Sequence, residues 1–353
     1  MWSMGDKGNP TIFDVARLAG VARGTVDRVV YNRGGVSEKT AGKVRDAIAK
    51  LGYSANPVAA RLASKKRYTI ACLIPEAGPG DYWDVVKDGF FQAAEADRSH
   101  SVSVSLHRFD TDSLESYREA CREVLESRPS GVVMNVVFED ELRLFTAELL
   151  KQGIPYAFVD RKVDDLPYTV YCGADPWDAG YLGAYLLTHR QQVGDIAFVR
   201  IRRKSPADPN KLRRDGFMRY LRDHLPGCRV STVFIPPENP DEALNILEDF
   251  CRKHPEIKHF TMANSRVHLM VPFLRMHPDP ERSVVGYDDL QRNLDAVREG
   301  LVEYLVTRRS PMQAYNVVSL FAESLIAGKA PQRRDHYMHM DILGRLNLKD
   351  YEL

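Results

Sequence analysis

The sequence predicts an α/β protein in which a small all-α N-terminal region precedes a larger, doubly wound parallel-sheet body. Three observations predict this organisation. At 353 residues the chain is too long for one ordinary hydrophobic core. Residues 1–67 carry 13 Lys and Arg against 5 Asp and Glu, a net charge of +8, which leaves −7 for the remainder. After residue 67, short apolar runs alternate many times with amphipathic stretches, as in strands joined by crossover helices.

Helix start and stop signals define the N-terminal region. Thr11 can cap a first helix, which Gly20 interrupts, and a second short helix is predicted over 23–30. A third runs from the capping residue Ser37 to about Leu51 and ends at Gly52. Asn56-Pro57 then suits the start of a short helical piece over 58–63, and the charged stretch 64–67 predicts a domain boundary.

The body is predicted from its apolar periodicity. The expected strands are 69–74, 101–106, 131–137, 156–159, 195–199, 230–235, 259–262 and 283–285. The expected helices include 83–98, 113–127, 139–152, 175–188, 213–224 and 240–253. In such a fold, ligands bind in the crevice outside the carboxyl ends of the strands, so a small-molecule site is expected there.

Several classes of protein are disfavoured by the same sequence. No run of 18 apolar residues is present, so we expect no membrane span, and the N-terminus has no apolar signal-peptide core. The five cysteines are scattered and form no C-x-x-C pair, as expected of reduced thiols in a cytoplasmic protein. We find no P-loop, H-E-x-x-H or G-x-S-x-G motif, and His336 and His339 make a poor metal site. The sequence therefore predicts no enzymatic activity, cofactor or metal.

The basic N-terminal region has the plan of a helix-turn-helix, whose second helix enters the DNA major groove by its N-terminal residues. Those residues are Arg23, Gly24, Thr25 and Asp27, with Arg28 one turn further on. Arginine is the preferred reader of guanine, and lysines and arginines neutralise phosphates. The alternative is that three short helices rich in Lys and Arg resemble this motif by composition alone.

The basic N-terminal region, here called the head, also resembles a known family. Residues 11–21, Thr25-Val26, Arg28-Val29, Val36-Ser37, Leu51-Gly52-Tyr53 and Asn56-Pro57-Val58-Ala59 resemble the lactose-repressor (LacI/GalR) family. The resemblance implies that Arg23, Gly24 and Arg28 face bases, and that Thr11, Thr25 and Asn32 lie near phosphates. It implies a DNA-dependent hinge helix over 58–63, with Asn56 and Ala59 at the DNA and Leu62 levering into the minor groove. The alternative for Leu62 is a packing residue in a linker helix.

Two positions of the head depart from the family pattern. Ala22 stands where the family usually has a capping serine, which removes a cap worth about 1 kcal/mol. Asp27 stands where the family often has serine. A carboxylate there repels phosphates but can accept a hydrogen bond from cytosine, so we expect Asp27 to contribute to sequence specificity rather than to affinity.

The body resembles the two-lobed periplasmic-binding-protein-like effector domain of the same family, more loosely. Recognisable segments include Phe158-Val159-Asp160-Arg161, Arg213-Arg214-Asp215-Gly216-Phe217 and Val285-Gly286-Tyr287-Asp288-Asp289. The resemblance implies a ligand cleft that contains Tyr82, Trp83, Asp160, Arg161, Arg213, Asn264, Asp288 and Arg309. Carboxylates and guanidiniums suit a sugar, whose apolar face Tyr82 or Trp83 could stack on. Because Arg309 replaces a common glutamine, the arginines favour an anionic effector, such as a sugar acid or a phosphorylated sugar.

The expected domains are a helix-turn-helix at 1–55, a hinge helix and linker at 56–67, and an effector domain at 68–353. The effector domain is expected to comprise lobe one, about 68–171 plus 304–333, and lobe two, about 172–303 plus 334–353. The function predicted is that of an effector-controlled transcription regulator that binds a near-palindromic double-stranded operator, and the resemblance implies that it acts as a repressor. A homodimer is expected because residues 341–353 are too few for the family's tetramerising helix. The main alternative is a sugar-binding receptor without specific DNA recognition; a non-specific architectural protein and a carbohydrate enzyme are further alternatives.

Overall fold

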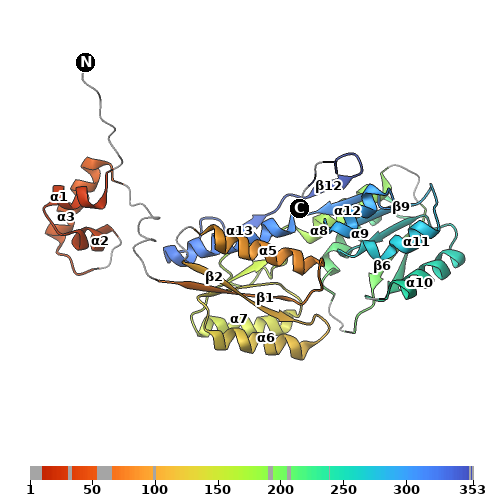
Figure 1. Cartoon of the computed structure of the whole chain (residues 1–353), viewed down its shortest axis with the longest axis horizontal. Coiled ribbons are helices and arrows are strands. Elements are labelled where there is room, and N and C mark those ends of the chain that lie inside the picture. Colours follow the sequence, from red (N-terminus) through yellow and green to blue (C-terminus); the bar gives the residue numbers. More distant parts are fainter. Residues whose placement is uncertain are drawn as a thin grey trace, which may run out of the picture. The chain divides into compact units, whose positions relative to one another are not determined.

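The structure is a computed structural model that describes residues 10–30, 34–53, 66–97, 101–189, 194–204, 208–237, 239–349 and 351. The chain divides into two compact units, Met1–Lys66 and Arg67–Leu353, which are described separately as the head and the body (Figure 1). The predicted hinge helix over 58–63 and the predicted DNA-binding residues Asn32, Asn56, Ala59 and Leu62 lie outside the described residues.

The head consists of three helices around a small core. These are α1 (Ile12–Ala19), α2 (Arg23–Val30) and α3 (Glu38–Leu51). Val15, Val26 and Val44, one from each helix, are fully buried and pack in one cluster. Gly20 and Gly52 end α1 and α3 with φ of 66° and 62°, the left-handed conformation that glycine adopts without strain. The three predicted helices are therefore confirmed.

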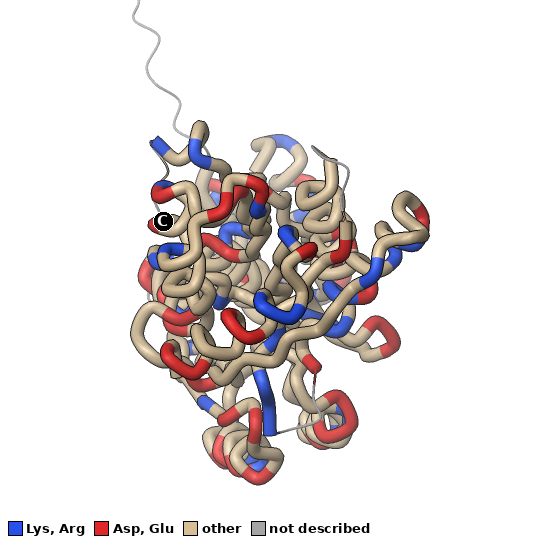
Figure 2. The backbone as a smooth tube through the Cα atoms, turned by 90° about the vertical axis from the view of Figure 1, so that its right-hand side faces the viewer, with Lys and Arg blue, Asp and Glu red and all other residues tan. Residues whose placement is uncertain are grey.

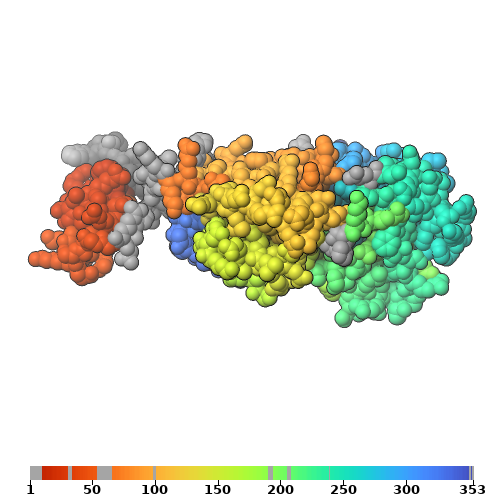
Figure 3. Space-filling model, turned by 90° about the horizontal axis from the view of Figure 1, so that it is seen from below, coloured from red at the N-terminus to blue at the C-terminus, as the bar shows by residue number. Residues whose placement is uncertain are grey.

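The first lobe of the body is a six-stranded, fully parallel sheet with the order β11-β5-β4-β3-β1-β2. Its strands are β1 (Tyr68–Pro75), β2 (Val102–Phe109), β3 (Gly131–Met134), β4 (Tyr156–Val159), β5 (Tyr171–Gly173) and β11 (Asp335–Tyr337). One face packs against α6 (Leu114–Ser127) and α7 (Glu139–Lys151), and the other against α5 (Tyr82–Ala96) and α13 (Ser310–Ala327). Figure 3 shows C-terminal residues, coloured blue, beside the orange and yellow residues of this lobe.

The second lobe has a six-stranded sheet with the order β12-β10-β9-β8-β6-β7, parallel except for β12. Its strands are β6 (Ile196–Ile201), β7 (Val230–Ile235), β8 (His259–Met262), β9 (Ser283–Tyr287), β10 (Tyr304–Thr307) and β12 (Asp341–Gly344). One face packs against α8 (Pro176–Thr188) and α9 (Lys211–His224). The other packs against α10 (Pro240–Lys253), the 3-10 helix η1 (Val267–Met270), α11 (Val271–Met276) and α12 (Gln291–Arg298).

The two lobes repeat one plan. If the strands of each lobe are numbered as they occur in the chain, the order 2-1-3-4-5 is found in both, and a late strand is added beyond the fifth. The fourth strands are β4 and β9, so Asp160 and Asp288, which follow them, occupy equivalent positions. The predicted doubly wound body is confirmed, and its two sheets bring their carboxyl-end loops to a common cleft.

The chain passes between the lobes at three places within residues 67–349. It crosses at residues 174–175, at 308–309 and at 338–340, between elements of different lobes. The predicted lobe boundaries fall a few residues early: 304–307 is β10 of the second lobe, and 335–337 is β11 of the first. Strand pairing is the reason, because Tyr304 pairs with Val285 and Asp335 pairs with Tyr171, and each strand completes its sheet before the chain crosses.

Candidate functional site

The surface of α2 presents the side chains that the sequence placed at DNA. Arg23, Gly24 and Arg28 are exposed, while Thr25 and Asp27 are half-buried. Neither Arg23 nor Arg28 forms an ion pair with another described residue, so both guanidiniums are available to an acidic partner. The Arg23 guanidinium lies 5.2 Å from the centre of the Phe13 ring.

Phe13 was not predicted from the sequence as a site residue. It lies on α1 and is 58% exposed, although it belongs to a helix with a clear apolar side. The sequence signal that could have identified Phe13 is an aromatic residue placed beside the buried apolar side of an amphipathic helix. A ring that is exposed next to an arginine can contact a thymine methyl group or a sugar while it orients the guanidinium.

The first two helices of the head, α1 and α2, differ in how their first turns are capped. The Asp14 carboxylate accepts hydrogen bonds from the Thr11 backbone N–H, at 2.9 Å, and from the Thr11 hydroxyl, at 2.7 Å. These bonds lower the pKa of Asp14. At α2 the residue that precedes the helix is Ala22, whose carbonyl accepts from Thr25 N and Val26 N but which has no side-chain acceptor. The cap that the sequence predicted to be missing is therefore missing.

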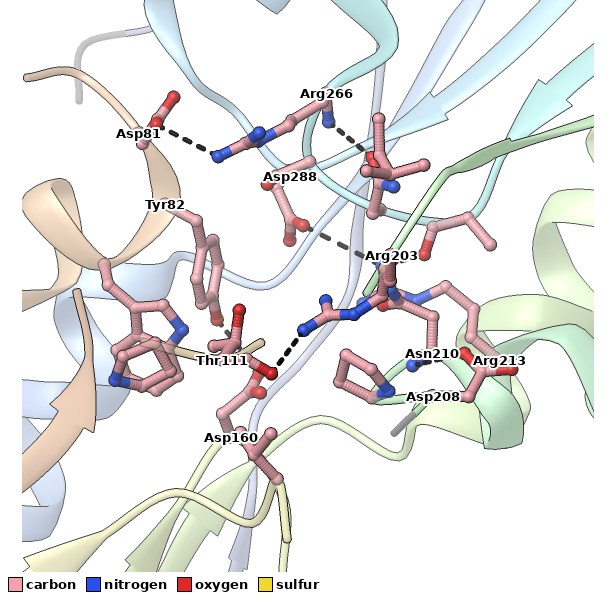
Figure 4. A pocket seen from close by; sticks show the side chains of 18 of the residues that line it. Asp81, Tyr82, Thr111, Asp160, Arg203, Asp208, Asn210, Arg213, Arg266 and Asp288 are labelled. Carbon is pink, nitrogen blue, oxygen red and sulfur yellow. Dashed lines mark hydrogen bonds and ion pairs between the residues drawn. The ribbon is translucent and has the colours of Figure 1, made fainter. Parts of the chain in front are cut away.

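A cleft of about 640 Å³ lies between the two lobes of the body, at the carboxyl ends of both sheets (Figure 4). Seven of the eight residues predicted to bind effector line it: Tyr82, Trp83, Asp160, Arg161, Arg213, Asn264 and Asp288. They come from elements of both lobes, and the topology explains why residues so distant in sequence meet. The cleft has the position that a doubly wound fold predicts for a ligand.

Arg309 is the exception, and its predicted place in the cleft is wrong. The Arg309 side chain is 61% exposed and its Nε donates to Asp341 at 2.6 Å, outside the cleft. Its neighbour Arg308 lines the cleft instead and is 4% exposed. Arg309 has a φ of 51°, and this left-handed residue at the start of α13 turns its side chain away from that of Arg308.

Arg308 ties the two lobes together at the floor of the cleft. Its guanidinium forms an ion pair with Asp160 of the first lobe and donates to Asp288 of the second at 3.2 Å (Nε) and 3.0 Å (Nη2). Burial lowers the pKa of Arg308, but Asp160 and Asp288 outweigh burial and the net pKa is raised. A buried cation that two carboxylates share is held firmly in its charged form.

Tyr82 joins this network through its hydroxyl group. That oxygen donates to Asp160 at 2.9 Å and accepts from Arg308 at 3.0 Å and from Gln313 at 2.6 Å. Burial raises the pKa of Tyr82. The Tyr82 ring meets the Trp83 ring edge-on, with 5.3 Å between the ring centres. Tyr82 therefore contributes a polar group to the floor, and Trp83 is the second aromatic residue that lines the cleft.

Both carboxylates at the floor stand on residues with left-handed backbone. Asp160 has a φ of 68° and Asp288 a φ of 65°, which is uncommon outside glycine, although Asp tolerates it better than most residues. Their amides still bond within the sheets, Asp160 to Cys172 O at 3.0 Å and Asp288 to Val306 O at 2.9 Å. Each of these strands is thus followed by a left-handed aspartate whose carboxylate contacts Arg308.

Arg213 is positioned by close helix packing. At Gly180 of α8, an added Cβ would lie 1.8 Å from the Arg213 carbonyl oxygen, so only glycine permits this approach of α8 to α9. The buried guanidinium donates to Ala263 O at 2.8 Å, lies 3.8 Å from Asp288, and covers the Tyr287 ring at 4.5 Å. Burial and the charge of Arg308 lower the pKa of Arg213.

Direct ties between the lobes lie at two places on the rim of the cleft. Asp81 of the first lobe accepts from Arg266 at 3.2 Å and from Arg292 at 2.6 Å, both of the second lobe. Elsewhere on the rim, Arg203 of the second lobe donates to Thr111 O at 2.9 Å and pairs with Asp112 (Figure 4). These residues were not predicted from the sequence, because their partners lie in the other lobe and no local motif marks them.

The lining of the cleft is rich in charge. Among the described residues it contains seven carboxylates and seven guanidiniums, so its formal charges balance. Figure 2 shows acidic and basic residues interspersed along the backbone. The described residues contain no His, Cys, Asp and Glu grouping suited to a metal ion, and none of their helices is long and apolar enough to cross a membrane.

Comparison with known families decides the assignment. Residues 11–56 match the family of bacterial regulatory proteins of the lacI type, and residues 70–330 match the periplasmic binding protein domain. The chain belongs to the LacI family. It combines a LacI-type DNA-binding domain with a periplasmic-binding-protein domain, so this LacI-family protein is a ligand-controlled DNA-binding regulator.

Solved structures agree with this assignment. A candidate LacI transcriptional regulator from Bacteroides fragilis is 28% identical over 81% of the chain and all of its own, with a TM-score of 0.76. A glucose-galactose binding protein from Geobacillus stearothermophilus (19% identity, 81% and 100% covered, TM-score 0.69) has the same fold. So does a solute-binding protein from Actinobacillus succinogenes with bound D-allose (16%, 81% and 100%, TM-score 0.68). No curated protein matches the chain significantly.

Proposed function

We propose that this LacI-family regulator acts in the cytoplasm as a homodimer that represses transcription from a near-palindromic operator, and that a small carbohydrate controls its DNA binding. The observation that carries this proposal is the pairing of two features in one chain. One is a recognition helix whose exposed arginines, Arg23 and Arg28, form no ion pair with another described residue, and the other is a cleft between two lobes. Neither feature needs a chemical step, so we propose that the protein is not an enzyme.

At the operator, Arg23, Gly24 and Arg28 would face base edges, with Thr25 and Asp27 beside them. The exposure of the two arginines supports this, because a guanidinium can donate two hydrogen bonds to one guanine. Thr11 would lie near a phosphate, and either its hydroxyl or its backbone N–H would have to leave Asp14, which accepts from both, in order to donate to that phosphate. The proposed phosphate contact of Asn32 and the minor-groove contacts of Asn56, Ala59 and Leu62 lie outside the described residues.

In the body, the effector would lie between Asp160, Arg161, Arg213, Asn264 and Asp288, against Trp83. Hydroxyl groups can accept from guanidiniums and donate to carboxylates, and the cleft offers both. That relatives of the same fold were solved with D-allose and with D-arabinose supports a carbohydrate. The effector would control the angle between the lobes, and it can do so only by binding one angle more tightly than the other.

Selection of bound sequences from random double-stranded DNA tests this function with the full-length protein. We expect enrichment of a near-palindrome whose half-sites lie about one helical turn apart, and loss of enrichment with R23A or R28A. Recovery of DNA without a common sequence would contradict operator recognition. It would favour the alternative, a sugar-binding receptor without specific DNA recognition.

A further inference from the structure

The distribution of charge within the cleft is uneven, although the totals balance. Two of the seven carboxylates, Glu76 and Asp110, are exposed and pair with no cation among the described residues, so solvent can screen their charge. At the floor, three guanidiniums (Arg161, Arg213 and Arg308) face two carboxylates (Asp160 and Asp288). The floor therefore carries one positive charge in excess, in the part of the cleft that is least exposed to solvent.

The two floor carboxylates are already engaged. The Asp160 carboxylate accepts hydrogen bonds from the Tyr82 hydroxyl, from Arg308 and, at 3.2 Å, from the Asn135 amide. Asp288 receives two hydrogen bonds from Arg308, and its second oxygen lies 3.8 Å from Arg213. A ligand hydroxyl that seeks an acceptor would have to displace protein donors, so the floor offers fewer free acceptors than its two carboxylates suggest.

Free donors, by contrast, remain. Arg161 pairs with no carboxylate among the described residues, and its only hydrogen bond is a long one, 3.5 Å, to Val136 O. The Nε atoms of Arg161 and Arg213 are buried without a hydrogen-bond partner. Burial and the neighbouring Arg308 lower the pKa of Arg213, which agrees with an excess of positive charge at this place. Buried donors and unbalanced buried charge are costly unless a partner satisfies them.

We propose that the effector is an anionic monosaccharide derivative, whose carboxylate or phosphate group lies at the floor and is held by Arg161 and Arg213. This proposal rests on the proposed function of the cleft as the effector site. A planar carboxylate or a phosphate accepts paired hydrogen bonds from guanidinium and supplies the missing negative charge, which a neutral hydroxyl cannot do. Arg308 contributes indirectly, because it occupies the carboxylates that would otherwise neutralise Arg161 and Arg213.

Thermal shift and calorimetric titration of the full-length protein with matched sugars test the proposal. The pairs are D-gluconate with D-glucose, D-galacturonate with D-galactose, and D-glucose 6-phosphate with D-glucose. We expect an anionic member to raise the melting temperature by at least about 2 °C while its neutral partner does not. Comparison of the sugar acids with the sugar phosphate shows whether the protein prefers a carboxylate or a phosphate group. The proposal is overturned if only neutral sugars stabilise the protein, or if no anionic member does.

Variants locate the charge effect. For the anion that binds, Arg161→Gln should weaken binding roughly 10-fold to 100-fold, and Arg161→Lys should restore part of the loss. The matched control is Arg200→Gln, because Arg200 also lines the cleft but is paired with Asp208 at 2.8 Å. Equal losses in the two glutamine variants would contradict a specific role for Arg161. Selection of operator DNA without sugar distinguishes failure of this proposal from failure of the proposed function. If a palindrome is enriched but no anionic sugar binds, the anionic effector is ruled out and operator recognition still stands.

Discussion

Arg308 and Arg309 are adjacent in the chain but have opposite surroundings. Arg308 is buried and shared by one carboxylate of each lobe, whereas Arg309 is exposed and paired with Asp341. The sequence predicted Arg309 in the cleft, whereas the structure places its neighbour Arg308 there. The choice depends on the left-handed φ of Arg309, and no residue pattern announces a left-handed arginine.

This difference predicts unequal losses of stability. Arg308→Met removes one partner of a buried network and leaves Asp160 and Asp288 without their cation, so the free energy of unfolding should fall by about 3–5 kcal/mol. Arg309→Met removes an exposed pair and should cost no more than about 1 kcal/mol. Urea unfolding of the two variants beside the parent measures both. Similar losses would show that Arg308 is not the tie between the lobes.

His268 lies in η1 of the second lobe, and its surroundings predict that the stability of the fold depends on pH. Burial lowers the pKa of His268 to about 4, although its hydrogen bond with Asn293, at 2.9 Å, acts in the opposite direction. The unfolded chain binds a proton at this residue near pH 6.5, whereas the folded protein resists protonation down to about pH 4. Stability is thus retained above pH 6.5 and is lost as the pH falls between these values.

The loss from His268 should amount to at most about 3 kcal/mol by pH 4. Unfolding free energies of the parent and of His268→Gln, measured from pH 7.5 to 4, provide the test. The variant should show a shallower slope below pH 6.5, although its stability at pH 7.5 falls somewhat if the amide fits less well. Parallel curves would mean that other groups cause the acid lability.

Some elements were predicted at their exact bounds, whereas others, including the 18-residue helix α13, were not among the predicted ones. Strands such as 230–235 and 259–262, and the helix 240–253, match the structure at both ends because apolar period and caps agree there. The predicted strand 131–137 stops at Met134, although residues 135–137 remain buried. Strands β5, β11 and β12 have three or four residues, too few for a periodicity, and tertiary pairing alone defines them.

Helix α2 predicts a gain of stability from a single substitution. Ala22 precedes the helix and supplies no side-chain acceptor to its first N–H groups. Ala22→Ser should place a hydroxyl oxygen near them and stabilise the head by about 0.5–1 kcal/mol. Thermal unfolding of the head, followed by helical circular dichroism, measures the change. Ala22→Gly is the control, since it alters the backbone without adding a hydroxyl group.

The same helix carries the specificity prediction at Asp27. This half-buried acid lies on the segment that would enter the major groove, where it would repel phosphates and accept from a cytosine amine. Asp27→Ser should change the preferred base at one position of each half-site and leave affinity for unrelated DNA equal or higher. Selection from random DNA with both proteins compares the preferences. An unchanged preferred sequence would contradict a reading role for Asp27.

At the scale of the whole body, the rim ties predict an effect on lobe closure. Asp81 joins two arginines of the other lobe, so Asp81→Asn should remove attractions that exist only while the lobes are close. We expect faster amide hydrogen exchange in the cleft loops and an effector affinity lowered by roughly threefold to tenfold. Asp165→Asn is the control, because Asp165 pairs with Arg143 within one lobe. Equal exchange in both variants would contradict the closure role.

The repeated strand order of the two lobes has a consequence for ancestry. Two halves with one topology, each ending its fourth strand in a left-handed aspartate, are what duplication of a half-length precursor would leave behind. A symmetric pair of such precursors would have brought two like charges together across its axis. Arg308 breaks that symmetry, since one copy supplies a single cation for both carboxylates. A single chain can place one cation between the two carboxylates, whereas two identical subunits would each contribute the same side chain.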